Sequence, residues 1–322
     1  MNTNFSPPWW ASNRHVQTIL PVLTKVKKPQ LTRERLELDD GDFIDLDWLT
    51  TPQIKQAIVV IVHGLEGNSS SHYVRRMLAA CQAQHLCAVV HHHRGCSGEP
   101  NRLARSYHSG DTHDLHATLC LLKQRYPDSP LFAIGYSLGG NVLVKYLGEQ
   151  QQTSVLERAV VVSAPLQLAA CAERLETGFS TVYQSHLIKQ LQDKMCEKAS
   201  NSLLQSQLPL SKAAIRQLNT FHAFDDKITA PLHHFNDVND YYQKSSGLAY
   251  LRQIKKSTLV IHAKDDPFMT DAVIPTEQQL SSYVEYELHD KGGHVGFIDG
   301  GVPWRPHYYI EKRALSFLTA HR

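Results

Sequence analysis

Residues 131–150, LFAIGYSLGGNVLVKYLGEQ, decide the fold of this protein. They contain the pentapeptide GYSLG (135–139), a GxSxG pattern. The apolar stretch LFAIGY before it has the pattern of a buried strand, and GNVLVKYLGEQ after it has the pattern of a helix. Glycines on both sides allow a sharp strand-to-helix turn that exposes a serine at the end of a sheet. We therefore interpret Ser137 as a nucleophile, with an inert glycine-rich turn as the alternative.

The partners of such a serine should lie later in the chain. A serine hydroxyl needs a neighbouring base, and the order in this arrangement is serine, then an acid, then histidine. GGHVGF (292–297) follows the last predicted strand, so we predict His294 as the general base. AKDDPF (263–268) offers two acids. Comparison with hydrolases whose acid stands three residues after a strand-end glycine favours Asp266, and we expect Asp265 to cap the following turn.

Acyl transfer also needs hydrogen-bond donors for the negatively charged oxygen of its tetrahedral intermediate, and backbone amides usually supply them. One donor should be the amide of Leu138, the residue after the predicted nucleophile. The other should come from the turn after an earlier strand, which reads HGLEG (63–67). There we predict the amide of Leu65. A tight turn without a catalytic role is the alternative interpretation of this segment.

Short apolar stretches recur along the chain as buried-strand candidates: AIVVIVH (57–63), CAVVHH (87–92), LFAIGY (131–136), RAVVVSA (158–164), STLVIHA (257–263) and YVEYELH (283–289). Helical patterns lie between several of them, at 72–84, 110–125 and 139–150. This alternation predicts an α/β fold with a mostly parallel central sheet and helices on both faces. Residues 34–39 and 43–49 alternate apolar and polar around Gly41, which predicts an antiparallel hairpin at the sheet edge.

The alternation stops after Pro165. Helical segments rich in Gln, Lys and Leu fill much of the stretch before the next strand, at 186–206, 211–220 and 237–253. We predict a single domain over residues 1–322, in which residues 166–256 form a helical insertion over the sheet, a lid or cap. A peripheral helical layer without a gating role is the alternative.

Composition excludes several classes of protein. The 322 residues are 42% hydrophobic and 20% charged, which is typical of a globular chain. Lysine plus arginine (33) nearly balance aspartate plus glutamate (31), so no nucleic-acid partner is expected. We find no CxxC pair, no signal-peptide pattern and no apolar stretch long enough to span a membrane. We therefore expect a cytoplasmic protein with reduced thiols and no integral membrane segment.

Three consecutive histidines, His91, His92 and His93, raise the question of a metal site. Successive residues of a strand face opposite ways, so the three cannot all bind one ion. We interpret them as hydrogen-bonded packing residues and expect no metal and no organic cofactor. Arg94, directly after them, is compatible with recognition of an anionic group or with a structural ion pair.

Seven stretches form a more specific pattern than the pentapeptide: HVQTI (15–19), HGLEGNSSSHY (63–73), HRGCSGEPNRLARSYHSGDTHDL (93–115), GYSLGGN (135–141), FDDKITAPLHHF (224–235), AKDDPF (263–268) and GGHVGF (292–297). Together they resemble the YheT-like branch of the α/β-hydrolase superfamily, a relative of eukaryotic abhydrolase lipases and fungal medium-chain ester synthases. The resemblance covers most of the chain. It implies an α/β-hydrolase fold, esterase-like activity and a triad of Ser137, Asp266 and His294.

Our first hypothesis is a serine hydrolase that acts on small-molecule esters with short or medium acyl chains. An acyltransferase that passes the same acyl group to an alcohol or thiol is the second, and sequence does not separate the two. A binding module on a hydrolase scaffold, without chemistry, is the third. The sequence leaves the physiological substrate and the oligomeric state open.

Overall fold

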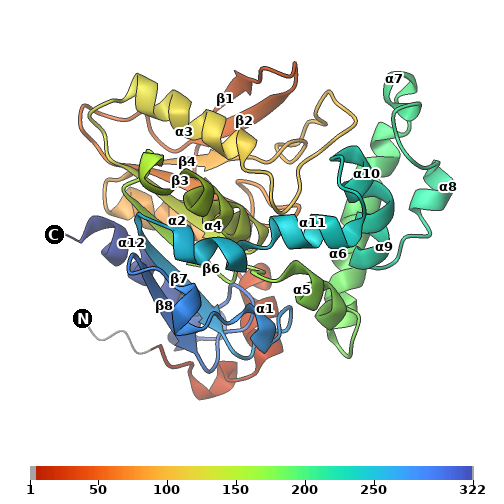
Figure 1. Cartoon of the computed structure of the whole chain (residues 1–322). Coiled ribbons are helices and arrows are strands. Elements are labelled where there is room, and N and C mark those ends of the chain that lie inside the picture. The colour runs from red at the N-terminus through yellow and green to blue at the C-terminus, as the bar shows by residue number, and fades with distance from the viewer. Residues whose placement is uncertain (1–4, 321–322) are drawn as a thin grey trace.

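The computed structural model describes residues 5–320, with an eight-stranded sheet at its centre in the order β1-β2-β4-β3-β5-β6-β7-β8 (Figure 1). The strands are β1 (Thr32–Glu37), β2 (Phe43–Trp48), β3 (Ile58–Val62), β4 (Cys87–His91), β5 (Leu131–Tyr136), β6 (Arg158–Val162), β7 (Ser257–Ala263) and β8 (Val284–His289). All pairs between β4 and β8 are parallel, whereas β1–β2 and β2–β4 are antiparallel. The predicted parallel sheet and edge hairpin are confirmed.

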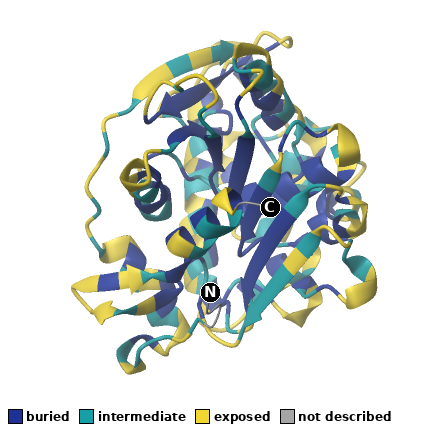
Figure 2. Cartoon of the chain, turned by 90° about the vertical axis from the view of Figure 1, so that its left-hand side faces the viewer, coloured by how far each residue is buried: buried dark blue, intermediate teal, exposed yellow. Residues whose placement is uncertain are grey.

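Helices cover both faces of the sheet, which explains the continuous apolar runs of its inner strands. In β3, Ile58, Val60 and Val62 point into one core, and the residues between them point into the other. The first core is completed by α3 (His113–Arg125) and α4 (Leu138–Gln150), and the second by α2 (His72–Ala83) and α12 (Tyr309–Thr319). In Figure 2 the inner strands are dark blue, whereas the outer surfaces of the helices are largely teal and yellow.

The strand order places the carboxyl ends of several strands beside one another. The chain leaves β3 for β4 on one side and then crosses to β5 on the other side, so the order reverses at β3. In open parallel sheets, ligands bind at the carboxyl ends of the strands near such a reversal. The turns after β3 and β5, and the loops after β7 and β8, all lie at this edge.

The stretch 166–256 is helical, and in Figure 1 much of it lies to one side of the sheet. Its elements are α5 (Leu168–Leu175), α6 (Ser180–Lys198), α7 (Ser202–Gln205), α8 (Lys212–Ile215), α9 (Phe221–Phe224), the π-helical turn η3 (Asp225–Thr229), α10 (Ala230–Leu232), α11 (Val238–Ser245) and the 3₁₀ segment η4 (Gly247–Gln253). Two small apolar clusters, separate from the cores on the sheet, hold these helices together.

The predicted boundaries of these helices were wrong. The helix predicted over 186–206 is α6, which begins at Ser180 and ends at Lys198. A new short helix then starts after Asn201, whose side chain accepts a hydrogen bond from the amide of Leu203. The helix predicted over 211–220 is a single turn, α8. The helix predicted over 237–253 stops at Ser245, because the chain then turns closely over α4, where a Cβ on Gly247 would lie 2.7 Å from Asn141 Oδ1.

Several elements lie where the sequence made no prediction. They are η1 (Trp9–Ala11), α1 (Arg14–Leu23), η2 (Gln151–Thr153), η5 (Asp271–Val273), η6 (Glu277–Gln279) and a hairpin of β9 (Ile298–Val302) and β10 (Arg305–Tyr308). Among residues 5–320, no helix combines the length and the apolar character that a membrane crossing requires.

Candidate active site

Ser137 stands at the sharp turn between β5 and α4. Its backbone has φ 50° and ψ −121°, a strained conformation for a residue with a side chain. The neighbouring glycines make the turn possible. A Cβ on Gly135 would lie 2.6 Å from the carbonyl oxygen of Gly139, and a Cβ on Gly139 would lie 2.3 Å from that of His63. The sequence pattern GxSxG is thus required by close backbone contacts at this corner.

Three side chains predicted to act together form a hydrogen-bonded chain. Ser137 Oγ lies 3.0 Å from His294 Nε2, and His294 Nδ1 lies 2.8 Å from Asp266 Oδ2. Asp266 is buried, with 2% of its surface exposed, whereas His294 is partly open to the pocket. An imidazole that donates through Nδ1 to a carboxylate presents the lone pair of Nε2 to the serine hydroxyl, as a general base requires.

The two neighbouring aspartates have different contacts. We had expected Asp265 to cap the turn that follows it, but this expectation was wrong. Its Oδ1 accepts a hydrogen bond from the amide of Gly293 at 2.9 Å. It is Asp266 that caps this turn, because its Oδ1 accepts from the amide of Phe268 at 2.8 Å while Oδ2 faces the imidazole. Asp265 therefore holds the loop before His294 and does not touch the imidazole.

The loop that carries His294 rests on helix α1. The amide of His294 donates to Thr18 Oγ1 at 3.0 Å, and Gln17 bonds both backbone groups of Ile298. A Cβ on Gly296 would lie 2.0 Å from the carbonyl oxygen of Gln17, so the loop and the helix are in direct backbone contact. The N-terminal motif HVQTI (15–19) thus supports the histidine loop, a role that the sequence did not reveal.

An aromatic ring also fixes the orientation of the imidazole. The ring of Phe268 stacks on that of His294, with centroids 4.0 Å apart and planes 4° from parallel. Phe268 follows the two aspartates in the chain, so one short loop after β7 supplies both the carboxylate and the stacking partner. The only sequence signal for this contact was its place in the motif AKDDPF (263–268).

The amides predicted as oxyanion donors border the same pocket as Ser137. Leu138 is the first residue of α4, so its amide has no helical carbonyl partner. In the described part of the chain, the amide of Leu65 also has no hydrogen-bond acceptor. The turn after β3, which contains Leu65, approaches the turn at Ser137 closely because residue 64 is glycine; a Cβ on Gly64 would lie 3.1 Å from the Cβ of Ser137.

Three polar side chains hold the turn that contains Leu65. Glu66 has a positive φ of 52°, and its amide donates to the hydroxyl of Tyr107 at 2.8 Å. The hydroxyl donates in turn to Glu66 Oε1 at 2.7 Å. Lys194 of α6 donates to the same carboxylate at 2.8 Å, and its pKa is raised, since its charged form interacts with Cys96 and Glu66 despite burial. An ion pair thus connects the insertion to this turn.

An apolar pocket extends from Ser137 into the insertion. Its walls include Leu168, Cys171, Ala172, Leu175, Leu187, Leu191, Met195, Phe221, Phe224, Ile228 and Leu232. Two acids also line the pocket. Glu66 is paired with Lys194, and Asp225 accepts hydrogen bonds from the hydroxyls of Thr229 and Tyr242, while burial raises the pKa of Asp225 to about 6. Because both acids already have partners in the protein, the pocket is best suited to apolar groups.

Arg94 has a structural role rather than a role in anion recognition. Its guanidinium is fully buried and forms ion pairs with three carboxylates at 2.6 to 3.0 Å, those of Asp40, Asp42 and Asp114. These pairs tie the loop after β4 to the β1–β2 hairpin and to α3. With its donors engaged in this way, Arg94 is not available to a ligand in the pocket.

The three consecutive histidines bond to separate partners, as expected of packing residues. His91 contacts Thr118 Oγ1 at 2.9 Å, His92 contacts an Asp47 carboxylate oxygen at 2.9 Å, and His93 contacts the carbonyl oxygen of His63 at 3.1 Å. Burial lowers the pKa of His91 and of His93 to about 3, so both rings are neutral near pH 7.

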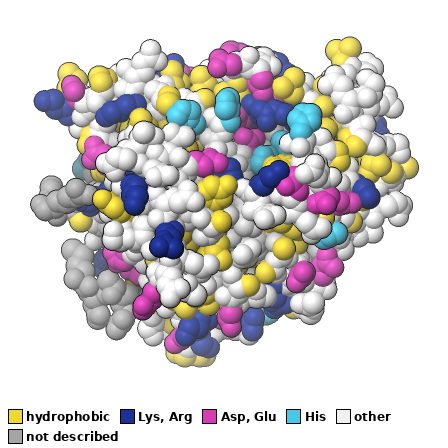
Figure 3. Space-filling model, viewed as in Figure 1, with side chains coloured by type: hydrophobic (Ala, Val, Ile, Leu, Met, Phe, Trp, Pro, Cys, Tyr) yellow, Lys and Arg dark blue, Asp and Glu magenta, His cyan; other side chains and the backbone are white. Residues whose placement is uncertain are grey.

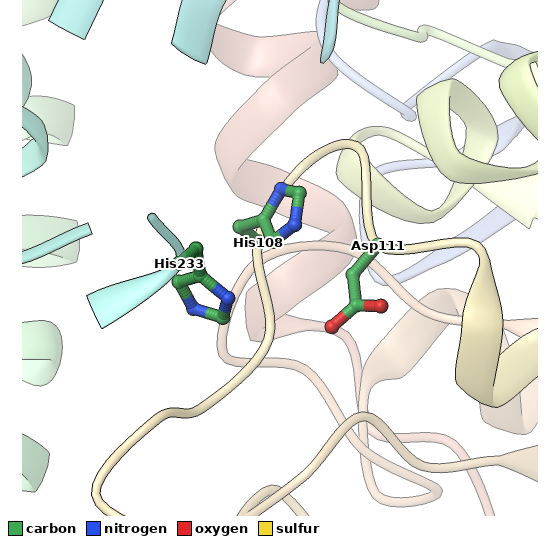
Figure 4. A group of neighbouring side chains, drawn as sticks. All are labelled: His108, Asp111 and His233. Carbon is green, nitrogen blue, oxygen red and sulfur yellow. The ribbon is translucent and has the colours of Figure 1, made fainter. Parts of the chain in front are cut away.

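Figure 4 shows a second polar group, His108, Asp111 and His233, of which the two histidines line the pocket. One possible ligand atom of each residue lies within 4.8 Å of the others, and two histidines with a carboxylate resemble a zinc ligand set. The details do not fit a metal. The amide of Gly110 donates to His108 Nδ1 at 3.1 Å, so the neutral ring carries its hydrogen on Nε2. Arg105 also pairs with Asp111 at 3.5 Å.

Comparison with known proteins agrees with this architecture. Residues 57–301 match the family model described as alpha/beta hydrolase fold. The chain is 42% identical to "Putative esterase YheT" of Escherichia coli, over 99% of this chain and 94% of that protein. It is 27% identical to "Phospholipase ABHD3" of Mus musculus, over 98% of this chain and 78% of that protein. The solved esterase Pf2001 of Pyrococcus furiosus superposes with a TM-score of 0.58 at 15% identity, covering 92% of this chain and 98% of that one.

Proposed function

The chain belongs to the α/β-hydrolase fold family, in its YheT-like branch, and from this premise we propose that it is a serine carboxylic ester hydrolase for short- or medium-chain acyl esters. The observation that carries the proposal is the hydrogen-bonded chain from Ser137 through His294 to Asp266, at the end of an apolar pocket. Residues 1–322 then act as one domain, with residues 166–256 as its cap.

The reaction follows from the roles of these side chains. His294 takes the proton of Ser137 as the hydroxyl attacks the ester carbonyl, and Asp266 stabilises the imidazolium that forms. The amides of Leu65 and Leu138 donate to the oxyanion, a contribution of roughly 3 kcal/mol for each donor. His294 then protonates the leaving alcohol. Water attacks the acyl-enzyme with His294 again as the base, and Ser137 takes the proton from His294 as the acid leaves. No cofactor is needed.

The apolar walls of the pocket favour binding of the substrate through an unbranched apolar acyl group. Each buried methylene contributes about 0.8 kcal/mol, or about fourfold in kcat/KM, until the chain fills the space between α5, α6 and α9. Activity should therefore rise with acyl length and then level off. We place the enzyme in the cytoplasm, because its six cysteines are unpaired and five of them are buried.

The test is the hydrolysis of p-nitrophenyl esters from acetate to laurate by the wild type and by Ser137→Ala. We expect the variant to lose turnover by on the order of 10⁴-fold or more. Ser185→Ala is the matched control, because Ser185 is exposed on α6 and bonds only within its own helix. Full turnover by Ser137→Ala would exclude the proposed nucleophile. A new ester formed when an alcohol is added would assign acyl transfer instead.

A further inference from the structure

Helix α1 is apolar on a side that faces solvent. Its buried side packs on the histidine loop and consists of Gln17, Thr18 and Pro21. Counting from His15, the spacing of four, seven and eight residues places Ile19, Val22 and Leu23 on one stripe away from that side. These three are 36%, 60% and 71% exposed. A surface helix normally carries polar residues there, so within residues 5–320 the stripe is an apolar face without a partner.

The start of α6 extends the same face. Phe179 and Val182 are 51% and 55% exposed, although they belong to a segment far along the chain from α1. The two elements touch, because the ring of His15 lies 4.5 Å from that of Phe179 and its Nδ1 lies 2.9 Å from the hydroxyl of Tyr183. We call Ile19, Val22, Leu23, Phe179 and Val182 the α1–α6 face.

Positive charge surrounds the N-terminal side of this face. Residues 5–31 contain no acidic residue and four cations, Arg14, Lys25, Lys27 and Lys28. All four are exposed and none forms an ion pair with a described residue. At the end of α5, next to Phe179, Glu173 and Glu176 outnumber Arg174, so the positive charge comes from the N-terminal segment alone. Figure 3 shows basic, acidic and hydrophobic side chains together along the lower edge of the molecule.

The face adjoins the mouth of the pocket. A groove runs between the end of α1 and α6, with Val22, Leu23 and Lys25 on one wall. Leu65, Glu66 and Leu187 border this groove and also line the pocket that contains Ser137. Anything that covers the α1–α6 face therefore lies against the entrance to the site.

We propose that the α1–α6 face docks on the surface of an anionic phospholipid bilayer. Apolar side chains surrounded by unpaired cations match an interface that offers acyl chains beneath negative headgroups. A second copy of this chain would bring the same four cations against one another or near them, whereas the bilayer neutralises them. Docking itself is independent of the proposed chemistry. That docking serves to deliver an ester to the mouth of the pocket rests on the proposed function.

The experiment is co-sedimentation of the full chain with vesicles of phosphatidylcholine alone and of phosphatidylcholine with 30% phosphatidylserine. We expect binding to the mixed vesicles that weakens as salt is raised. Lys25, Lys27 and Lys28 changed together to Ala should weaken it on the order of 100-fold. Val22→Asp with Leu23→Asp should abolish it. Ile54→Asp is the matched control, since Ile54 is 92% exposed outside this face and binding should not change.

The outcomes separate this proposal from the proposed function. Turnover of water-soluble p-nitrophenyl acetate and the thermal midpoint should be unchanged in the Val22/Leu23 variant, which shows that the fold is intact. Equal binding to both kinds of vesicle, or binding by this variant as tight as the wild type, would overturn the proposal. So would a dimer in analytical ultracentrifugation that becomes a monomer on Leu23→Asp, because the occupant would then be a second copy. The vesicle-binding, thermal-midpoint and ultracentrifugation results do not depend on Ser137.

Discussion

Asp266→Asn should cost far more activity than Asp265→Asn, although the two residues are adjacent. Oδ1 of Asp266 accepts from the amide of Phe268, so an asparagine keeps its carbonyl oxygen there and turns its NH₂ toward His294. An NH₂ group only donates, which forces Nδ1 of His294 to accept and moves the ring hydrogen to Nε2. The imidazole then has no lone pair for Ser137. We expect kcat to fall about 10⁴-fold, equivalent to about 5.5 kcal/mol.

Asp265→Asn serves as the matched control for that prediction. Its contact is the hydrogen bond that Oδ1 accepts from the amide of Gly293, and an asparagine oxygen accepts it equally well. We expect kcat within about fivefold of the wild type, since a neutral hydrogen bond contributes about 1 kcal/mol. The assay is hydrolysis of p-nitrophenyl butyrate, with circular dichroism to verify folding. An equal loss in both variants, or less than a tenfold loss for Asp266→Asn, would refute the reasoning.

Three further predictions concern packing and charge. Gly139→Ala should lower the free energy of unfolding by about 3 kcal/mol or more, because its Cβ would overlap backbone atoms; a thermal midpoint equal to the wild type would contradict this. Lys198 is buried among carbonyl oxygens, and burial lowers its pKa to about 7, so the unfolded state binds the extra proton above pH 7. The contribution of Lys198 to the free energy of unfolding should therefore rise by about 1.4 kcal/mol per pH unit from about pH 7 toward 10. Denaturant titrations should show this slope in the wild type and in the control Lys189→Met, whose lysine is exposed, but not in Lys198→Met. Lys194→Met should lower kcat about tenfold with little change in KM, since Glu66 loses the cation that holds the turn containing Leu65, the proposed oxyanion donor; a change in KM alone would argue against that role.

The parallel sheet and its edge hairpin were predictable because their signals are local, whereas the order of the strands within the sheet was not predicted. Each inner strand is a short apolar run, and each intervening helix has its own period, so the order of elements can be read without knowing any long-range contact. The side chains predicted to act together also lie together, since Ser137, Asp266 and His294 follow strand ends that meet at one edge of the sheet. Their catalytic roles remain predictions that the experiments above test.

What could not be predicted depends on contacts between distant segments. Nothing in HVQTI (15–19) indicates that Gln17 and Thr18 hold a loop near residue 294. The helices of the insertion have weak local signals, and their ends are set by individual caps and by packing on α4, so the predicted bounds were wrong. Asp265 was assigned the turn that Asp266 caps, because residue type alone does not say which of two adjacent carboxylates faces outward.

The contact between α1 and the histidine loop has a consequence for synthesis on the ribosome. Helix α1 emerges before residues 292–298, the loop that its buried side contacts. Ser137 emerges between the two. A nascent chain that has not yet reached residue 294 thus lacks the proposed base of Ser137. In the proposed mechanism, acyl chemistry requires an early segment and a late one to close on each other, which delays it until all eight strands of the central sheet have been translated.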